Sequence, residues 1–295
     1  MTTFRLLDAF CCAGGASVGY HLAGFDVDGV DIRPQKHYPF RFYQADAIAF
    51  VREYGHMYDA IHASPPCQHD TCLRHLSGKE YVDLVGATRA VLEEVGKPWI
   101  IENVYGADLR WPVLLCGSMF GLGAWCLDGQ WRQLRRHRLF ECSFPVLTPA
   151  CQHRGQPVGN YGNGGYRDRT IVKGINAYVG TMPERRAAMG IGWTNRYELS
   201  QAIPPAYTSY IGAQLMAILI RRGDESGEGE NARPVGGTAG AADLRPPASG
   251  GCADRGAGER GGVSGPVREV PPTGDVRNRS AGPSSSVAAA GGDAV

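Results

Sequence analysis

Two residue types that can carry out covalent and acid–base chemistry stand directly after buried, strand-like runs. Cys67 follows an apolar run and two prolines, Pro65 and Pro66. Neither proline has an N–H to donate and each fixes its own φ, so the strand ends there and Cys67 lies in a stiff loop. Glu102 follows the apolar run 99–101. Such a pair offers a thiolate nucleophile and a general acid, although a lone cysteine also suits a small buried side chain.

A glycine-rich turn follows the first apolar run of the chain. Residues 11–19 (CCAGGASVG) come after a strand expected over 3–10 and open a helix that reaches Leu22. A second strand, over 25–30, ends at Asp31. A βαβ unit of this kind places a nucleoside over the turn, with its ribose hydroxyls on the acid. A second interpretation stays open, in which the glycines serve only the close packing of helix and strand.

The remaining elements alternate in type along the chain. Strands are expected over 42–46, 58–63 and 99–101, and helices over 47–54, 81–95, 182–189 and a final stretch through Leu219. This alternation predicts an α/β fold with a doubly wound, mostly parallel sheet. Because the carboxyl ends of parallel strands meet at one edge, one shared cleft is expected for Phe10, Asp31, Asp46, Cys67 and Glu102.

The composition is that of a soluble globular protein, with 295 residues, 43% hydrophobic and 20% charged. No apolar run reaches the length of a membrane span, and the first thirty residues lack the pattern of a secretory signal, so a cytoplasmic location is expected.

Nine cysteines, unevenly spaced, favour reduced thiols over a disulfide framework. Cys126, Cys142, Cys151 and His153 contain no paired C-x-x-C, so no metal is expected.

The last part of the chain differs in composition from the rest. Residues 223–295 contain one Leu, no Ile and no aromatic residue. Such a segment cannot bury enough apolar surface to offset its ordering entropy, so a disordered tail without a catalytic part is predicted. Without it, residues 1–222 carry 23 basic and 19 acidic side chains, a balance that permits a polyanionic partner without requiring one.

The order of these landmarks resembles that of the DNA (cytosine-5) methyltransferases, over about residues 4–221. The motifs that carry the resemblance are Asp8-Ala9-Phe10-Cys11-Cys12-Ala13-Gly14-Gly15, Val30-Asp31, Ala45-Asp46, Pro65-Pro66-Cys67-Gln68, Glu102-Asn103-Val104, Arg136-His137-Arg138 and Gln201-Ala202-Ile203-Pro204-Pro205. The Pro-Cys-Gln and Glu-Asn-Val motifs are the specific part. Short members encoded by bacteriophages and their bacterial hosts look most similar. One departure is Cys12, which stands where the family usually has a glycine.

The resemblance implies a Rossmann-like, S-adenosylmethionine-dependent methyltransferase fold and a set of roles. Cys67 would add to C6 of a flipped-out cytosine, Glu102 would protonate N3, and Arg138, with Arg136 as a second candidate, would bond the cytosine O2. The cofactor S-adenosylmethionine would contact Phe10, Gly14, Gly15, Asp31, Ile32, Asp46 and Pro66. The implied partner is double-stranded DNA in a bacterial or phage-infected cell, and we expect a monomer.

The same motifs suggest a division of the chain into four parts. We expect a cofactor-binding catalytic domain over 1–141 and a small target-recognition region over 142–180. Helices over 181–222 would pack back on the catalytic domain, and 223–295 would form the tail.

Three other functions compete with this interpretation. A few relatives with this motif set methylate tRNA, so the same chemistry on RNA is one alternative. An amino-group methylase is a second, because Ser64-Pro65-Pro66 is superficially similar, but those enzymes place an aromatic residue where this chain has Cys67. A catalytically silent DNA-binding relative is the third; the presence of Cys67 and Glu102 argues against it, and Cys12 keeps it open.

Overall fold

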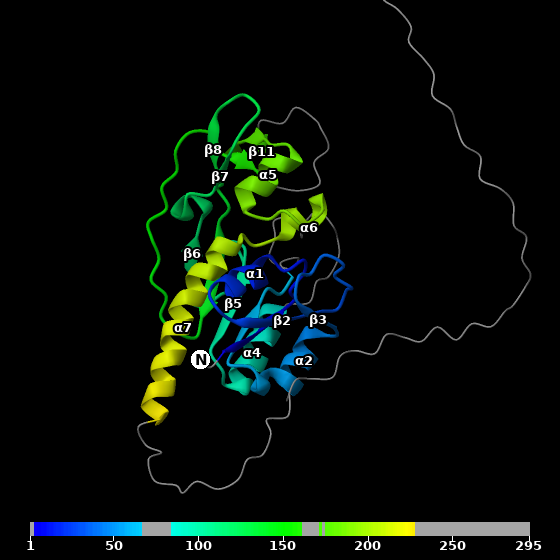
Figure 1. Cartoon of the computed structure of the whole chain (residues 1–295), viewed down its shortest axis with the longest axis vertical. Coiled ribbons are helices and arrows are strands. Elements are labelled where there is room, and N and C mark those ends of the chain that lie inside the picture. The colour runs from blue at the N-terminus through cyan, green and yellow to red at the C-terminus, as the bar shows by residue number, and fades with distance from the viewer. Residues whose placement is uncertain (1–2, 67–83, 161–170, 173–174, 228–295) are drawn as a thin grey trace, which may run out of the picture. The chain divides into compact units, whose positions relative to one another are not determined.

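The computed structural model describes residues 3–66, 84–160, 171–172 and 175–227, and a seven-stranded sheet in the order β3-β2-β1-β4-β5-β9-β6 forms its centre (Figure 1). The strands are β1 (Arg5–Ala9), β2 (Asp26–Asp31), β3 (Arg41–Gln44), β4 (Ala60–Ala63), β5 (Trp99–Asn103), β6 (Val113–Leu115) and β9 (Arg138–Cys142). The pairs among β1 to β5 are parallel, and β9 runs antiparallel to both β5 and β6. The doubly wound, mostly parallel sheet predicted from the sequence is confirmed.

The strand order reverses beside β1. The chain passes from β1 to β2 and β3 on one side, then returns to β4 and β5 on the other. Ala9 is in register with Val30 and with Ala63, and Ala63 with Ile101. The residues that follow these four therefore lie at one level along the carboxyl edge, which is where open α/β sheets bind their ligands.

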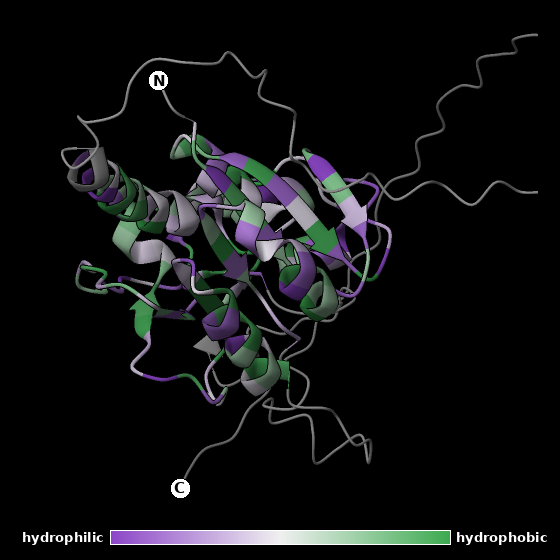
Figure 2. Ribbon diagram, turned by 90° about the horizontal axis from the view of Figure 1, so that it is seen from below, coloured by the Kyte–Doolittle hydropathy of each residue, from purple (hydrophilic) through white to green (hydrophobic). Residues whose placement is uncertain are grey.

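Two helical layers cover the sheet, because successive residues of a strand point to opposite faces. On one face Leu6 belongs to a core shared with α1 (Gly15–Leu22) and α7 (Pro205–Gly227). On the other face Leu7 belongs to a core shared with α2 (Ala47–Tyr54) and α4 (Leu84–Val95). A short 3₁₀ turn, η1 (Gly55–Met57), connects α2 with β4. Hydrophilic and hydrophobic residues alternate along the helices, as expected of helices with one buried face (Figure 2).

Helices α1 and α7 cross at close range. A Cβ added to Gly19 would lie 2.0 Å from Thr208 Oγ1 and 2.2 Å from the carbonyl oxygen of Pro205. The Thr208 hydroxyl in turn donates to the carbonyl oxygen of Ala16 at 2.8 Å. A residue without a side chain is therefore needed at position 19, and this contact fixes α7 on the helix that opens from the glycine turn.

A second, smaller core lies apart from the two layers. Its elements are β7 (Gly123–Trp125), β8 (Trp131–Gln133), β10 (Val158–Gly159), β13 (Tyr178–Val179), α5 (Met182–Met189) and α6 (Arg196–Gln201), with β11 (Ile171–Val172) and β12 (Ile175–Asn176) forming a separate antiparallel pair. The 3₁₀ turn η2 (Gly117–Phe120) packs instead on the core that contains α7. The buried residues at its centre include Ala124, Leu134, Val158, Met189 and Leu199. Figure 1 shows α5 beside β7, as their contacts require.

The helices of the segment 181–222 thus divide between two cores. α5 and α6 contribute to the smaller core, whereas α7 packs on α1. We expected all of them to pack back on the catalytic domain. Helix α7 also continues to Gly227, past the predicted start of the tail at 223, while 228–295 lie outside the described residues. Among the described residues no helix has both the length and the apolar composition that crossing a bilayer requires.

Candidate active site

The register of the sheet brings four of the predicted positions to one edge. Phe10 follows β1 directly, Asp31 is the last residue of β2, and Glu102 is the fourth residue of β5. Pro66 lies in the loop after β4 and is exposed. The next residue, Cys67, and the segment that follows it up to residue 83 lie outside the described residues, so the predicted nucleophile stays a prediction from the sequence.

The glycine turn after β1 is held against the end of β2. Phe10, Cys12 and Gly14 all have positive φ, at 58°, 46° and 79°. The Cys12 N–H donates to Asp31 Oδ2 at 3.1 Å, and the Arg33 N–H donates to Asp31 Oδ1 at 2.9 Å. Cys12 therefore adopts a backbone conformation that glycine adopts more readily, and its amide helps to orient the Asp31 carboxylate.

The two glycines of the turn have a packing role. A Cβ on Gly14 would lie 2.8 Å from Pro39 Cδ, and one on Gly15 would lie 2.5 Å from the carbonyl oxygen of Ile203. Each glycine therefore permits a close approach of another segment. The packing interpretation left open by the sequence is supported for both, and it is compatible with a cofactor contact through their backbone.

The residues beside the turn suit a nucleoside. Asp31 is 8% exposed, and each of its oxygens keeps acceptor capacity beyond the single backbone bond that it makes. Ile32, 66% exposed, offers an apolar surface next to that carboxylate. The Ala45 N–H donates to the carbonyl oxygen of Asp31 at 3.1 Å, which brings Asp46 to the same edge. A carboxylate that can accept from ribose hydroxyls, beside an apolar side chain that can contact a base, is the combination that the predicted cofactor needs.

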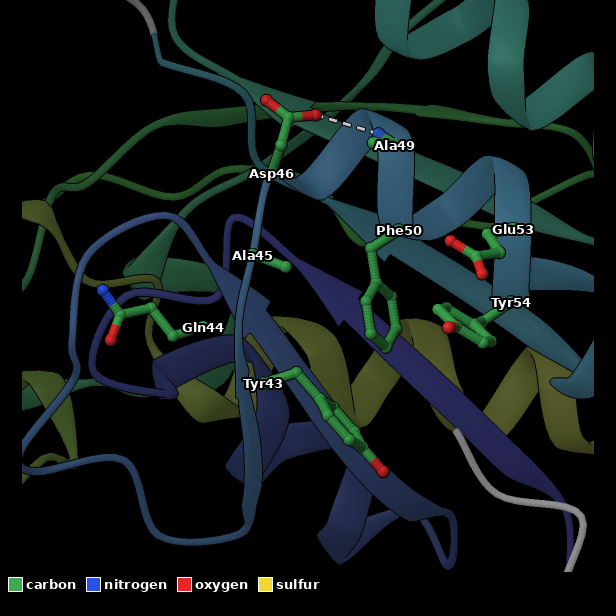
Figure 3. Close-up of a pocket in the computed structure, with 8 residues that line it drawn as sticks. All are labelled: Tyr43, Gln44, Ala45, Asp46, Ala49, Phe50, Glu53 and Tyr54. Atoms are coloured by element: carbon green, nitrogen blue, oxygen red, sulfur yellow. Dashed lines mark hydrogen bonds between the residues drawn. The ribbon is translucent and has the colours of Figure 1, made fainter. Parts of the chain in front are cut away.

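Asp46 has a structural role that the sequence analysis did not predict. It is the N-cap of α2, and its Oδ1 accepts from the Ala49 N–H at 2.8 Å. Figure 3 shows this bond, with the Asp46 carboxylate turned toward the start of the helix. A hollow of about 270 Å³ lies beside it, between the end of β3 and α2, with Phe50 and Tyr54 in its wall.

Glu102 forms a buried ion pair at the carboxyl end of β5. It is 7% exposed, and its Oε1 lies 2.9 Å from Nε of Arg138, the first residue of β9. Burial raises the pKa of the Glu102 carboxyl group, whereas Arg138, Arg136 and a hydrogen bond from Ser64 act in the opposite direction. The effect of burial is the largest, so Glu102 holds its proton to higher pH than an exposed glutamate does.

A chain of polar side chains reaches Glu102 from the core. The Tyr20 hydroxyl lies 3.0 Å from His62 Nδ1, and His62 Nε2 lies 2.9 Å from Ser64 Oγ. Complete burial lowers the pKa of His62 to about 3, so its imidazole is neutral. A neutral ring that accepts from Tyr20 at Nδ1 donates to Ser64 at Nε2, which leaves the Ser64 hydroxyl free to donate to Glu102. Neither His62 nor Ser64 carries a sequence signal for this function.

Asn103 connects the end of β5 with the loop that precedes Cys67. Its Nδ2 donates to the carbonyl oxygen of Pro65 at 3.1 Å, and its Oδ1 accepts from the Val104 N–H at 2.9 Å. The side chain is 2% exposed. Asn103 therefore fixes the start of the Pro65–Pro66 loop relative to Glu102, which gives a physical reason for an asparagine after the glutamate.

Arg136, the second candidate for the cytosine contact, bonds backbone carbonyl groups in the structure. Its side chain is 2% exposed and donates to the carbonyl oxygens of Ala202, Asn160 and Ser200 at 3.0, 3.2 and 2.7 Å. The guanidinium therefore joins β9 to the segment before α7, with its hydrogen bonds directed at these backbone acceptors. Arg138, half-buried and beside Glu102, is the arginine that remains at the edge of the sheet.

Asp8, one of the motif residues, is a buried carboxyl group behind the glycine turn. It is fully buried, its Oδ2 accepts from the Ser17 hydroxyl, and its Oδ1 has no hydrogen-bond partner among the described residues. Burial raises the pKa of Asp8 to about 7, and the negative charges of Asp31 and Glu102 act in the same direction. The group is therefore largely neutral at slightly acidic pH.

The cysteines and histidines considered as metal ligands are arranged differently from the set named in the sequence. Cys126 and Cys142 lie elsewhere, whereas Cys151 and His153 meet Cys116 and His137. The ligand atoms of this group all lie within 4.8 Å of one another.

No family model and no curated protein matches the chain. Solved structures do resemble it. A DNA modification methyltransferase encoded within a prophage of E. coli is 15% identical over 74% of this chain and 100% of its own, with a TM-score of 0.49. The S. pombe Dnmt2 methyltransferase is 14% identical over 74% and 99%, with a TM-score of 0.48, and the Entamoeba histolytica methyltransferase EhMeth is 12% identical over 75% and 99%, with a TM-score of 0.41. At these identities the likeness concerns the fold alone, and the three solved structures named here are methyltransferases.

Proposed function

We propose that the chain is an S-adenosylmethionine-dependent DNA (cytosine-5) methyltransferase. The observation that carries the proposal is the buried pair of Glu102 and Arg138, beside a loop that leads through Pro66 toward Cys67. The order of the sequence motifs supports it as well, because the resemblance assigns the roles of acid, substrate contact and nucleophile to these residues.

Cys67 supplies the nucleophile. Carbon 5 of cytosine reacts poorly with electrophiles, and addition of a thiolate to carbon 6 converts the ring to an enamine whose carbon 5 is reactive. A thiolate suits this step because it is strongly nucleophilic and also able to leave. After carbon 5 has been substituted, a base removes its proton and Cys67 is eliminated.

Glu102 and Arg138 act on the polar edge of the ring. Addition at carbon 6 moves negative charge toward N3, and the protonated Glu102 carboxyl group donates a proton there. General acid catalysis of this kind is typically worth about 10²- to 10⁴-fold in rate. Arg138 donates to the cytosine O2, a charge-assisted hydrogen bond that orients the ring.

Positioning residues keep these groups in place. Asn103 holds the Pro65 carbonyl, the Ser64 hydroxyl bonds to Glu102, and Arg136 fixes the start of β9 just before Arg138. All of these contacts come from buried or half-buried atoms, so the arrangement exists before substrate binds and costs little reorganisation during the reaction.

Asp31, Ile32 and the glycine turn at Phe10, Gly14 and Gly15 would hold the cofactor. Asp31 would accept from the ribose hydroxyls and Ile32 would contact the adenine. Bound S-adenosylmethionine supplies the methyl group that is transferred. The proposed roles of Asp46 and Pro66 in the same site rest on the resemblance.

Duplex DNA is the proposed substrate. The target base is stacked inside the duplex, so it must be flipped out, which costs a few kcal/mol that DNA contacts must offset. The region 142–180 is short, and we infer that it recognises only a few base pairs.

Trapping on DNA that contains 5-fluorocytosine tests the chemistry, because fluorine at carbon 5 blocks the final elimination. With S-adenosylmethionine present, the wild-type chain should form a covalent adduct that survives denaturation. Cys67→Ala should form none, and the matched control Cys72→Ala should behave like wild type. Equal adducts from wild type and Cys67→Ala would refute the assignment of the nucleophile.

Methylation assays on duplex DNA and on tRNA, run in parallel, test the substrate. Label should enter duplex DNA at cytosine. Label that enters only tRNA would overturn the DNA assignment, and DNA binding without any methyl transfer would favour the silent DNA-binding alternative.

A further inference from the structure

A cluster of four potential metal ligands lies outside the proposed active site. It consists of two thiols and two imidazoles from three separate stretches of the chain: Cys116 at the N-cap of η2, His137 just before β9, and Cys151 with His153 in the extended segment that follows β9. Two thiolates and two imidazoles form a donor set that Zn²⁺ prefers in structural sites.

Four of the six distances among the four ligand atoms are 2.9–3.5 Å and none of the six exceeds 4.8 Å, so small side-chain shifts would place these atoms at the corners of one coordination tetrahedron. His153 Nε2 lies 3.4 Å from Cys116 Sγ, 2.9 Å from Cys151 Sγ and 3.2 Å from His137 Nε2. His137 Nε2 lies 3.5 Å from Cys151 Sγ. With Zn–S of about 2.3 Å and Zn–N of about 2.0 Å, a tetrahedron requires separations of roughly 3.3–3.8 Å between its corners. Each histidine also presents one and the same nitrogen, Nε2, to the neighbours named here, as a shared ion at the centre requires.

Backbone hydrogen bonds hold the segment that carries Cys151 and His153 in place. The Gln152 N–H donates to Ser118 Oγ at 3.3 Å, and the Arg154 N–H donates to Gln133 Oε1 at 2.8 Å. The Ser118 hydroxyl lies 3.4 Å from both sulfur atoms, so it can donate to a thiolate from outside the tetrahedron. Such outer hydrogen bonds commonly orient metal ligands.

We propose that this chain binds one structural Zn²⁺ ion through Cys116, His137, Cys151 and His153. All four positions of the tetrahedron come from protein side chains, so the ion has no open position for substrate and acts structurally. Cys116 is buried and His153 is exposed, so the site is open to solvent on one side, by which the ion can arrive. The proposal does not rest on the methyltransferase function.

The ion would connect parts of the molecule that matter for the proposed reaction. His137 stands between Arg136 and Arg138, and Cys151 and His153 lie in the segment that leads from β9 into β10 and the smaller core. A zinc ion at this place fixes the start of the predicted recognition region against the strand that carries Arg138. In this region the metal–ligand bonds would stabilise the fold in place of apolar packing, as they often do in small modules.

Metal analysis of the purified chain tests the proposal. The chain must carry no polyhistidine tag, which would itself bind metal. Mass spectrometry of the dialysed wild type should find about one zinc per chain, and Cys151→Ser should retain less than about a tenth of that. Cys12→Ser removes an exposed thiol that lies outside the cluster and should keep the full complement.

Two measurements on the wild type alone keep the test independent of whether Cys151→Ser folds. A chelator should lower the melting temperature by about 5–15 °C, and added Zn²⁺ should restore it. Cobalt in place of zinc should give a thiolate-to-cobalt charge-transfer band and the visible bands of tetrahedral Co²⁺.

Three outcomes would overturn the proposal. The first is a wild type without zinc that shows no cobalt band, and the second is a Cys151→Ser variant that keeps its full zinc content. The third is a metal-free chain in which mass mapping finds a disulfide between Cys116 and Cys151.

Discussion

Opposing effects act on the carboxyl group of Glu102, and their balance decides what it can do. Arg138, 2.9 Å away, favours the carboxylate, and burial favours the neutral acid. Burial is the larger effect, so the pKa is raised. A general acid needs its proton when the substrate arrives, and the environment of Glu102 therefore suits proton donation better than a permanent ion pair does.

Glu102→Gln removes the proton donor and keeps the size of the side chain. We expect the single-turnover rate of methylation to fall by about 10²- to 10⁴-fold, with little change in DNA binding. In the wild type the rate should decline as pH rises through the raised pKa of Glu102, and this alkaline decline should be absent in the variant. Glu94→Gln, on the exposed face of α4, serves as the control. A variant rate within about threefold of wild type, which is the scatter expected of a surface change, would contradict the role.

Asp8→Asn should change how stability depends on pH. The pKa of Asp8 is about 7 in the folded protein, above its ordinary value of 3.8. Between these values the folded chain keeps a proton that the unfolded chain releases, so the wild-type free energy of unfolding falls as pH rises through this window and levels off above it. Asparagine keeps an acceptor for Ser17 and has no proton to lose.

Urea unfolding at about pH 5 and about pH 8 measures this effect. The stability of Asp8→Asn relative to wild type should increase between the two pH values by an amount on the order of 2–3 kcal/mol. Asp224→Asn, at an exposed position of α7, should follow the wild-type dependence. Parallel curves for wild type and Asp8→Asn would show that Asp8 is ionised at low pH in the folded state.

At the scale of the elements, the sequence was informative where pattern and position coincide. The glycine turn, the strand that ends at Asp31, the strand whose last residues include Glu102, and the helix Met182–Met189 follow from local signals and agree with the structure. The role of Arg136 could not be predicted, because its acceptors are carbonyl groups of Asn160, Ser200 and Ala202. Those atoms are distant in sequence, and no pattern around Arg136 indicates which way its side chain points.

The Cys116–His137–Cys151–His153 cluster was missed for a related reason. A C-x-x-C pair reveals a metal site because both ligands come from one turn. Here the ligands come from three stretches, and only the Cys151-x-His153 spacing is local. The register of β9 against β6, which pairs Leu115 with Arg138, brings Cys116 beside His137, and hydrogen bonds of Gln152 and Arg154 bring the third stretch to them. Neither the register nor these loop contacts could be predicted from the sequence.

Gly19→Ala tests the contact between α1 and α7. The added Cβ would lie 2.0 Å from Thr208 Oγ1 and 2.2 Å from a backbone oxygen, so α7 must move. We expect the free energy of unfolding to fall by about 3 kcal/mol, at the upper end for overpacked sites. Gly223→Ala, at a helical position with no atom within 4 Å of the added Cβ, should instead stabilise α7 by up to about 1 kcal/mol. Similar effects from both substitutions in denaturant unfolding would mean that the helices are not packed this closely.

At the scale of the molecule, two features of the chain organise the site. The doubly wound sheet places Asp31 and Glu102 at one edge, and the smaller core packs β10 and α5 around Leu134, four residues before Arg138. The doubly wound sheet was predicted from the alternation of strand-like and helix-like segments along the sequence. The sequence did not predict that residues 123–133 and 182–201 would share a core with residue 158, because that core is assembled from short segments with no strong periodicity of their own.

Removal of residues 228–295 tests where the functional unit ends. Tyr207, Ile211, Leu215 and Leu219 of α7 are buried in the core on the α1 side of the sheet, so the described fold is closed by a helix that ends at Gly227. The residues beyond it contain a single leucine and no aromatic side chain, too little apolar surface to contribute a core. A chain that stops after residue 227 should therefore keep its methylation rate, and its melting temperature should stay within about 2 °C of that of the full chain.

A chain that stops after Tyr210 loses three of the four buried α7 residues and should fail to give a cooperative thermal transition. A large loss of activity in the longer truncation, with its melting temperature unchanged, would show that the removed segment takes part in binding DNA.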